Sequence, residues 1–199
     1  MTVHSMSSEP VIWYFSARRR TIKFMRWTHG PVRNGGHSSP RLQSGWLLSY
    51  LEEKGILDNT LVVFTTDHGE YMGEHGLYSK NQLYETAYRI PLLMRLPGTI
   101  SAGTVVDRVV DTVDFQKTLL GLLDFKPCGR EQGCDASPLA RGEETEWADE
   151  SFVYHNSHNH AGIFTPEFEL AYTKGSGALL FDRKNDPEQV NNLFENPEY

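Results

Sequence analysis

The chain has 199 residues, of which 39% are hydrophobic, and its formal net charge is −7. This length suits one core with a small appended unit rather than two ordinary domains. The negative charge argues against a nucleic-acid-binding protein, since such proteins usually carry a basic excess. No apolar run approaches the roughly 20 residues that span a bilayer, and no signal-peptide core is visible. We therefore expect a soluble chain without a membrane span.

The first element expected in the chain is a helix that begins at Leu42. Residues 1–41 are left unassigned, because glycine and proline interrupt any period there. Apolar residues then recur with helical spacing, at Leu42, Trp46, Leu47, Tyr50 and Leu51. Gly55 follows at the position where glycine typically ends a helix.

A buried strand is predicted directly after this helix, at Leu61–Phe64. Its continuous β-branched and aromatic run is typical of strands that are buried on both faces in a parallel sheet. A further strand is expected between Ile90 and Leu96, and a capped amphipathic helix between Asp111 and Leu123. These elements predict an α/β fold.

The last third of the sequence has a different pattern of apolar residues. Residues 129–150 show no period and are interpreted as a loop or boundary. Three short strand-like pieces then predict a small antiparallel sheet, at Phe152–Tyr154, Phe168–Tyr172 and Ala178–Phe181. A terminal helix is expected to start at Asp186-Pro187-Glu188-Gln189, which combines an N-cap, a first-turn proline and a capping-box glutamine. The domain assignment is accordingly 42–128 for an α/β part and 129–199 for a linker with a small α+β subdomain.

The chain has two cysteines, Cys128 and Cys134. They lie close together in a loop, so a local disulfide and two free thiols both remain open.

The chemistry-bearing segment is Thr65-Thr66-Asp67-His68-Gly69-Glu70, at the expected end of the buried strand. Ligand sites in open α/β sheets lie outside the carboxyl ends of strands. A carboxylate and an imidazole are both metal ligands, and Gly69 would let the backbone turn sharply behind them. An Asp-His pair alone is more often a turn cap beside an ordinary loop histidine. The longer string that follows favours a divalent metal.

That string resembles the sulfatase family, which belongs with the alkaline-phosphatase-like enzymes. The resemblance rests on residues 55–70, Gly73-Glu74-His75-Gly76, Lys80, Tyr84-Glu85 and Arg89-Ile90-Pro91. Residues 180–193 also resemble the closing segment of sulfatases, through Leu180-Phe181-Asp182, Asp186-Pro187-Glu188 and Asn192-Leu193. The resemblance covers about 155 residues and implies a partial alkaline-phosphatase-like sheet-and-helix layer with a small antiparallel C-terminal sheet and a terminal helix.

The resemblance also implies roles for individual residues. Asp67 and His68 would be two ligands of a calcium ion, and Lys80 would bind the sulfate oxygens or the bridging ester oxygen. His75 would either touch the substrate side or make a structural hydrogen bond. Glu85 and Arg89 are four residues apart and are interpreted as a structural ion pair. The implied substrate is a sulfated carbohydrate or a small sulfate ester.

The sequence departs from the family in its nucleophile. Sulfatases use a Cys/Ser-x-Pro-Ser-Arg segment whose first residue becomes formylglycine, and this sequence contains none; Ser38-Ser39-Pro40-Arg41 is only a superficial echo. The early Asp-Asp pair that completes the calcium shell is absent as well. We therefore expect the C-terminal portion of a sulfatase, inactive by itself, with calcium bound weakly.

Two other functions remain open for this sequence. One is a phosphoester or phosphonate hydrolase of the same superfamily. The other is a non-catalytic remnant that binds an anion or a partner. Family members are often exported or lysosomal, but the sequence assigns no compartment.

A histidine-rich run covers His155, His158 and His160. Three imidazoles in six residues could chelate zinc or nickel. The spacing is not that of a structural zinc site, so a loop bordering the substrate cleft is the preferred interpretation.

Overall fold

The computed structural model describes residues 11–16, 21–25, 40–155 and 160–199, with side chains for 44–154 and 160–199. These residues form two compact units, which are described separately. The first holds the described residues up to His68 together with Ile90–Ala102, and the second holds Gly69–Arg89 together with Gly103–Tyr199. Residues 69–89 and 103–128 therefore belong to the same unit as the C-terminal sheet. Ser38, Ser39 and His158 lie outside the described residues.

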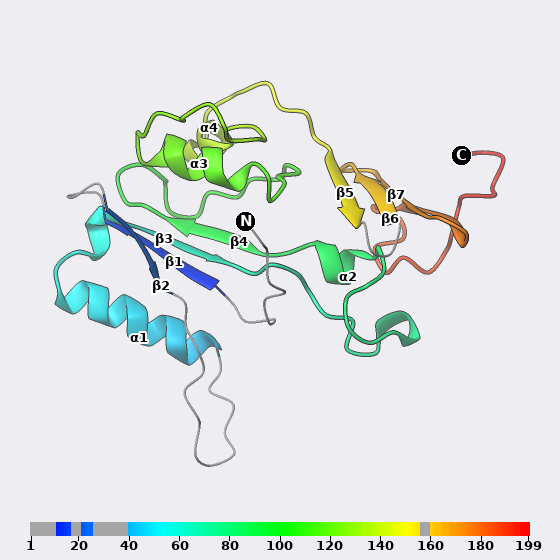
Figure 1. Ribbon diagram of the computed structural model, residues 1–199, viewed down its shortest axis with the longest axis horizontal. Coiled ribbons are helices and arrows are strands. Elements are labelled where there is room, and N and C mark those ends of the chain that lie inside the picture. The colour runs from blue at the N-terminus through cyan, green and yellow to red at the C-terminus, as the bar shows by residue number, and fades with distance from the viewer. Residues whose placement is uncertain (1–10, 17–20, 26–39, 156–159) are drawn as a thin grey trace, which may run out of the picture. The chain divides into compact units, whose positions relative to one another are not determined.

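The sheet of the first unit is antiparallel throughout (Figure 1). Its strand order is β2-β1-β3-β4, with β1 at Val11–Ser16, β2 at Thr21–Met25, β3 at Thr60–Thr65 and β4 at Leu92–Arg95. The strands predicted at Leu61–Phe64 and within Ile90–Leu96 are confirmed, but the expectation of parallel pairing for the first was wrong, since β3 pairs antiparallel with both β1 and β4. Burial along β3 alternates after Thr60: Leu61 and Val63 are fully buried, whereas Val62 and Phe64 are only half-buried. The apolar run reflects the central place of the strand rather than equal burial of both faces.

The helix α1 spans Pro40–Glu53 and ends in a Schellman motif. The Ile56 N–H donates to the Leu51 carbonyl at 3.1 Å, the Gly55 N–H donates to the Glu52 carbonyl at 2.8 Å, and Gly55 has φ +61°. Leu51 is buried, but Trp46 and Tyr50 of the predicted apolar stripe are exposed. A short 3-10 turn, η1 at Leu57–Asn59, then leads into β3.

The helices of the second unit are short. They are η2 at Glu74–Gly76, α2 at Glu85–Tyr88, α3 at Phe115–Leu122 and α4 at Ser137–Arg141. The helix α3 begins four residues after Asp111, because the Asp114 carboxylate accepts a hydrogen bond from the Asp111 N–H at 2.9 Å and holds these residues in a turn. The helix α4 was missed in the segment interpreted as loop. It is held against α3 by a hydrogen bond from Arg141 Nη2 to the Gly121 carbonyl at 2.6 Å.

The predicted C-terminal antiparallel sheet is confirmed. Its order is β5-β6-β7-β8, with β5 at Ser151–His155, β6 at His160–Phe164, β7 at Phe168–Thr173 and β8 at Gly177–Asp182. The strand β6 was missed, because its histidine-rich start was interpreted as a loop. His155 and His160 are in fact register partners of a β-hairpin, and the His160 ring lies 2.6 Å from the Thr173 hydroxyl through Nδ1.

The predicted terminal helix at Asp186 is wrong. The Asp186 carboxylate does accept hydrogen bonds from the N–H groups of Val190 and Asn191, but Gln189 has φ +53° and ends any helical path. The chain instead follows the edge of β8, where the Leu193 N–H donates to the Leu180 carbonyl at 2.8 Å.

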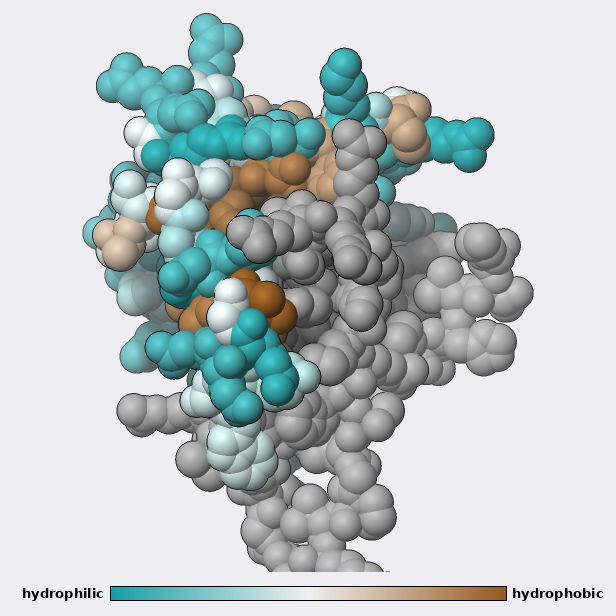
Figure 2. Space-filling view, turned by 90° about the vertical axis from the view of Figure 1, so that its left-hand side faces the viewer, coloured by the Kyte–Doolittle hydropathy of each residue, from teal (hydrophilic) through white to brown (hydrophobic). Residues whose placement is uncertain are grey.

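Several surface features bear on function. Apolar side chains lie among hydrophilic ones on the face drawn in Figure 2. In the first unit, Leu92 and Leu93 of β4 are both exposed.

Of the two states that the sequence left open for the cysteines, the structure shows free thiols: Cys128 and Cys134 are not bonded to each other, and both are exposed. Within the described ranges, no helix has the length and apolar character needed to cross a membrane.

Truncation of Leu61 tests whether β3 anchors the first unit. Because Leu61 is fully buried, Leu61→Ala should lower the free energy of unfolding by about 2–5 kcal/mol. Leu93→Ala on the neighbouring β4 removes the same atoms from a side chain that is 59% exposed, so its effect should be several-fold smaller. Urea unfolding followed by circular dichroism measures both changes. Equal losses from the two variants would contradict the assignment of β3 to the core.

Candidate active site

Asp67 and His68 lie just beyond the end of β3, in the first unit, as the sequence predicted. Asp67 is exposed and His68 is half-buried. Asp67 Oδ2 and His68 Nε2 are 3.6 Å apart. The Thr66 hydroxyl donates to the His68 carbonyl at 3.2 Å, which fixes the backbone of the turn. The two candidate ligand atoms therefore face each other on a single loop.

Their separation can be compared with the geometry of a bound cation. Two ligand atoms at about 2.4 Å from one ion and at right angles to each other lie about 3.4 Å apart. The observed 3.6 Å is close to this value, so the pair fits two adjacent positions of a metal shell. Within the described ranges, no group of three or more His, Cys, Asp or Glu side chains is gathered for a metal. Calcium takes six to eight oxygen ligands, so this pair alone supplies a small part of its shell.

Gly69 follows the pair and is constrained by close packing. A Cβ at this position would lie 1.8 Å from the Thr86 carbonyl oxygen. The Gly69 N–H also donates to the Ala87 carbonyl at 2.8 Å. The sequence argument invoked a sharp turn, whereas the structure requires glycine because the backbone of α2 is too near for any side chain.

His75 and Lys80 belong to the second unit, so the structure places them in a different unit from Asp67 and His68. His75 is exposed, adopts φ +52° within η2, and stacks on Tyr84 with ring centroids 4.0 Å apart and an interplanar angle of 13°. Lys80 is half-buried in the loop that precedes α2. The contact that the structure gives His75 is this ring stacking, which is neither the substrate contact nor the structural hydrogen bond that the sequence left open.

The dipeptide Tyr84-Glu85 is attached to the C-terminal sheet. The expected ion pair between Glu85 and Arg89 is present at 3.1 Å. Glu85 also pairs with Arg183, which follows β8, and both of these side chains are only 15% exposed. Arg183 donates in addition to the Thr165 carbonyl. The sequence analysis missed Arg183, although it stands next to the Leu180-Phe181-Asp182 segment.

A buried carboxyl group lies beside this ion pair. Glu169 of β7 is fully buried, and its Oε2 accepts a hydrogen bond from the Gln189 amide, which in turn accepts one from the Glu85 N–H at 2.8 Å. Burial raises the pKa of Glu169 to about 8, with a further rise from the nearby Glu85 and opposing effects from Arg183 and Gln189. Glu169 therefore retains its proton near neutral pH.

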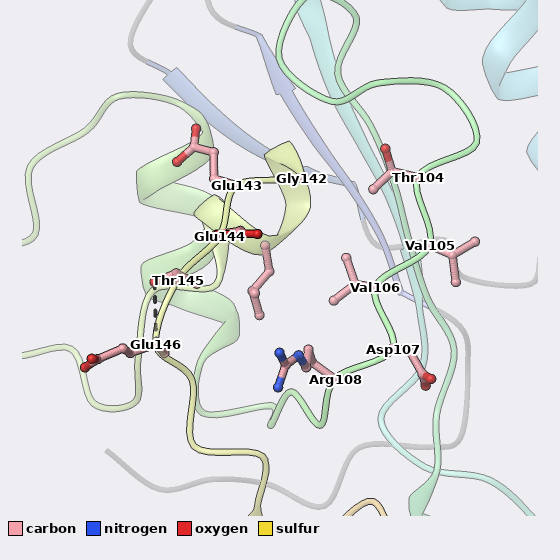
Figure 3. A pocket seen from close by; sticks show the side chains of 11 residues that line it. Thr104, Val105, Val106, Asp107, Arg108, Gly142, Glu143, Glu144, Thr145 and Glu146 are labelled. Carbon is pink, nitrogen blue, oxygen red and sulfur yellow. Dashed lines mark hydrogen bonds between the residues drawn. The ribbon is translucent and has the colours of Figure 1, made fainter.

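An open pocket of about 640 Å³ occupies another part of the second unit. Figure 3 shows residues 104–108 facing residues 142–146 across it. Three glutamates, Glu143, Glu144 and Glu146, lie on its rim, and the guanidinium of Arg108 is engaged by Asp149 at 2.7 Å. This acidic lining suits an anionic ester poorly, and none of the sequence-predicted site residues lines the pocket.

Comparison with known proteins assigns the family. Residues 73–199 match the family model described as N-sulphoglucosamine sulphohydrolase, C-terminal. The N-acetylglucosamine-6-O-sulfatase of Bacteroides thetaiotaomicron is 34% identical over 167 residues, which are 78% of this chain and 30% of that protein. The chain belongs to the sulfatase family, whose members are sulfuric ester hydrolases.

Solved structures extend the likeness to the fold. The structure of BT4656 in complex with its substrate D-glucosamine-2-N,6-O-disulfate superposes with a TM-score of 0.71 at 33% identity, over 78% of this chain and 34% of that chain. The phosphonate monoester hydrolase of Agrobacterium radiobacter superposes with a TM-score of 0.69 at 28% identity, over 79% and 35% of the two chains. The alkaline-phosphatase-like fold class is thereby confirmed. The present chain spans about a third of the length of the proteins it matches.

The buried Glu169 predicts a specific pH dependence of stability. Its folded pKa of about 8 lies above the ordinary value of 4.5, so its contribution to stability is fully present below about pH 4.5 and is lost as pH rises through about 8. Within this window the loss is about 1.4 kcal/mol per pH unit. Glu169→Gln keeps the shape without the titration and should flatten the slope. The exposed Glu188→Gln is the control. Urea unfolding at several pH values measures the slopes, and a slope unchanged by Glu169→Gln would refute the assignment.

Proposed function

We propose that this chain supplies the C-terminal part of a hydrolase that cleaves sulfate esters of carbohydrates. The observation that carries the proposal is the family membership, combined with an Asp-His pair at the end of β3 and Lys80 in the following loop. The relative from Bacteroides thetaiotaomicron is named for N-acetylglucosamine 6-sulfate, and the BT4656 complex holds a sulfated glucosamine. Sulfated amino sugars are therefore the first substrates to test.

Lys80 has the clearest chemical role in this proposal. Its ammonium would bind the sulfate oxygens or the bridging oxygen and neutralise negative charge that develops as the S–O bond breaks. His75 would stand beside the substrate, with its ring orientation held by the Tyr84 stack. Its role is then orientation or a hydrogen bond to the substrate.

Asp67 and His68 would hold a calcium ion in this proposal. Both are suitable ligands, and their 3.6 Å separation supports joint coordination. When bound, the ion would polarise the sulfuryl group and hold the nucleophile. A nucleophile segment of the Cys/Ser-x-Pro-Ser-Arg type is absent from this sequence, so the remaining ligands and the formylglycine would come from polypeptide outside it.

A phosphonate or phosphate ester hydrolase is the second candidate. The likeness to the phosphonate monoester hydrolase of Agrobacterium radiobacter supports it, and a metal, a lysine and an Asp-His pair serve phosphoryl transfer as well. The relative rates on matched sulfate and phosphonate esters decide between the candidates.

The activity test supplies the upstream part of the family. The upstream segment of the Bacteroides thetaiotaomicron sulfatase, with its nucleophile converted to formylglycine, is fused ahead of this chain. The fusion should hydrolyse N-acetylglucosamine 6-sulfate and 4-nitrophenyl sulfate, whereas the present chain alone should show no turnover. Lys80→Ala should lower kcat/KM by about 100-fold, the scale for loss of one charge-stabilising donor. Lys174→Ala, in the turn after β7, should leave it unchanged.

Three outcomes would count against this assignment. A fusion indifferent to Lys80→Ala would remove the role of Lys80. Robust turnover by the chain alone would show that it carries its own nucleophile. A preference for the phosphonate monoester would support the second candidate.

The metal prediction concerns the chain by itself. With Asp67 and His68 as its main ligands, calcium should bind with a Kd in the millimolar range or weaker. Millimolar calcium should then stabilise the fold by at most about 0.5 kcal/mol, since stabilisation follows RT ln(1 + [L]/Kd). Isothermal titration and Tm measurements with and without calcium test this, with Asp67→Ala as the matched variant. A micromolar affinity that Asp67→Ala abolishes would show that further residues of this chain complete the shell.

A further inference from the structure

Tyr71 is a buried residue that makes hydrogen bonds with the backbone on both sides of Lys80. It lies four residues after Asp67, and its neighbours Glu70 and Met72 are exposed, yet Tyr71 itself is only 1% exposed. A large, fully buried side chain inside an otherwise exposed loop needs a packing or hydrogen-bonding reason. The contacts of Tyr71 give that reason.

Tyr71 makes hydrogen bonds on both sides of Lys80. Its N–H donates to the carbonyl of Ser79 at 3.0 Å. Its hydroxyl accepts from the N–H of Gln82 at 2.9 Å and donates to the carbonyl of the same residue. The backbone is therefore anchored one residue before Lys80 and two residues after it.

The Tyr71 ring also connects to His75. It meets the Tyr84 ring edge-on, with centroids 6.2 Å apart and an interplanar angle of 87°. The Tyr84 ring in turn stacks on His75, and its centroid lies 5.9 Å from that of the Phe181 ring in β8. The Tyr71 side chain is thus linked to both candidate residues of the second unit, to Lys80 through the flanking backbone and to His75 through the Tyr84 ring.

We infer that Tyr71 is a positioning residue that fixes Lys80 for anion binding through its hydrogen bonds to Ser79 and Gln82. The inference rests on the proposed function in taking Lys80 as the anion-binding residue and a sulfate group as the anion. Tyr71 is not a catalytic residue, because its hydroxyl is used by the Gln82 backbone. Burial raises its pKa to about 12, so the hydroxyl remains a donor throughout the pH range of any assay.

Tyr71→Phe and Tyr78→Phe form a matched pair of variants. Each loses one phenolic hydroxyl in the same loop, but Tyr78 is 82% exposed. The probe is inorganic sulfate added to the full chain, followed through the backbone amide NMR signals of residues 79–82, with Lys80→Met as the variant that lacks the cation. Amide hydrogen exchange of residues 79–82 and the Tm are measured on the same samples.

Tyr71→Phe should weaken sulfate binding about fivefold or more, because it removes both hydrogen bonds between the hydroxyl and the Gln82 backbone, and one neutral hydrogen bond alone is worth about that factor. Exchange at Gln82 should also accelerate, while Tyr78→Phe changes neither quantity. Lys80→Met should abolish the sulfate response. If Tyr71→Phe retains both the sulfate affinity and the slow exchange of Gln82, the inference is overturned.

Two further results separate the possible failures. If the wild-type chain shows no sulfate response, Lys80 does not hold the anion in this chain by itself; the proposed function is then judged by the Lys80→Ala fusion, and positioning by the exchange of residues 79–82 alone. If Tyr71→Phe does not fold, wild-type exchange decides. The Tyr71 and Gln82 amide hydrogens should then exchange with equal protection factors. A Gln82 amide that exchanges as fast as the amide of Tyr78, whose side chain is exposed, would overturn the inference.

Discussion

The second unit depends on the ion pair between Glu85 and Arg183. Both side chains are largely removed from water, so loss of Glu85 would leave the buried Arg183 guanidinium without its carboxylate, whereas loss of Arg183 would leave Glu85 only its more exposed partner Arg89. The pair joins the start of α2 to the residue after β8, which are 98 residues apart in sequence. Gln189 and the protonated Glu169 complete the contact without adding a second negative charge beside Glu85. Tyr84 and Glu85, which follow the loop with His75 and Lys80, thus contact Phe181 of the C-terminal sheet and the segment after it.

The parts of the fold that sequence reasoning predicted have strong local signals. Gly55 marked the end of α1 because a left-handed residue there closes a Schellman motif. The apolar run at Leu61–Phe64 marked β3, and the short strand-like piece at Phe168–Tyr172 marked β7. The Asp67-His68 pair marked the loop after β3 only together with the longer string up to Pro91, which resembles the sulfatase family.

The failures have a common physical origin in tertiary contacts. Parallel pairing of β3 was inferred from its hydrophobicity, but direction depends on which strands lie beside it. Gln189 has the sequence signature of a capping box, yet its side chain makes hydrogen bonds with Glu85 and Glu169. These residues lie 104 and 20 positions away in sequence, so the side chain does not cap a local helix. Arg183, Glu169 and Tyr71 were missed for the same reason, since no local pattern distinguishes a buried tyrosine or glutamate from an exposed one.

The close approach of Gly69 to Thr86 limits what sequence change the site can accept. Gly69 contributes no functional group, yet every other residue type brings a Cβ into the Thr86 carbonyl oxygen. A saturation library that selects for folding should therefore reject all alternatives at position 69 and accept many at its exposed neighbour Glu70. Such intolerance at a residue without chemistry would be misread as catalytic if function were mapped from mutational data alone. In this molecule it reports on the spacing between two backbone segments.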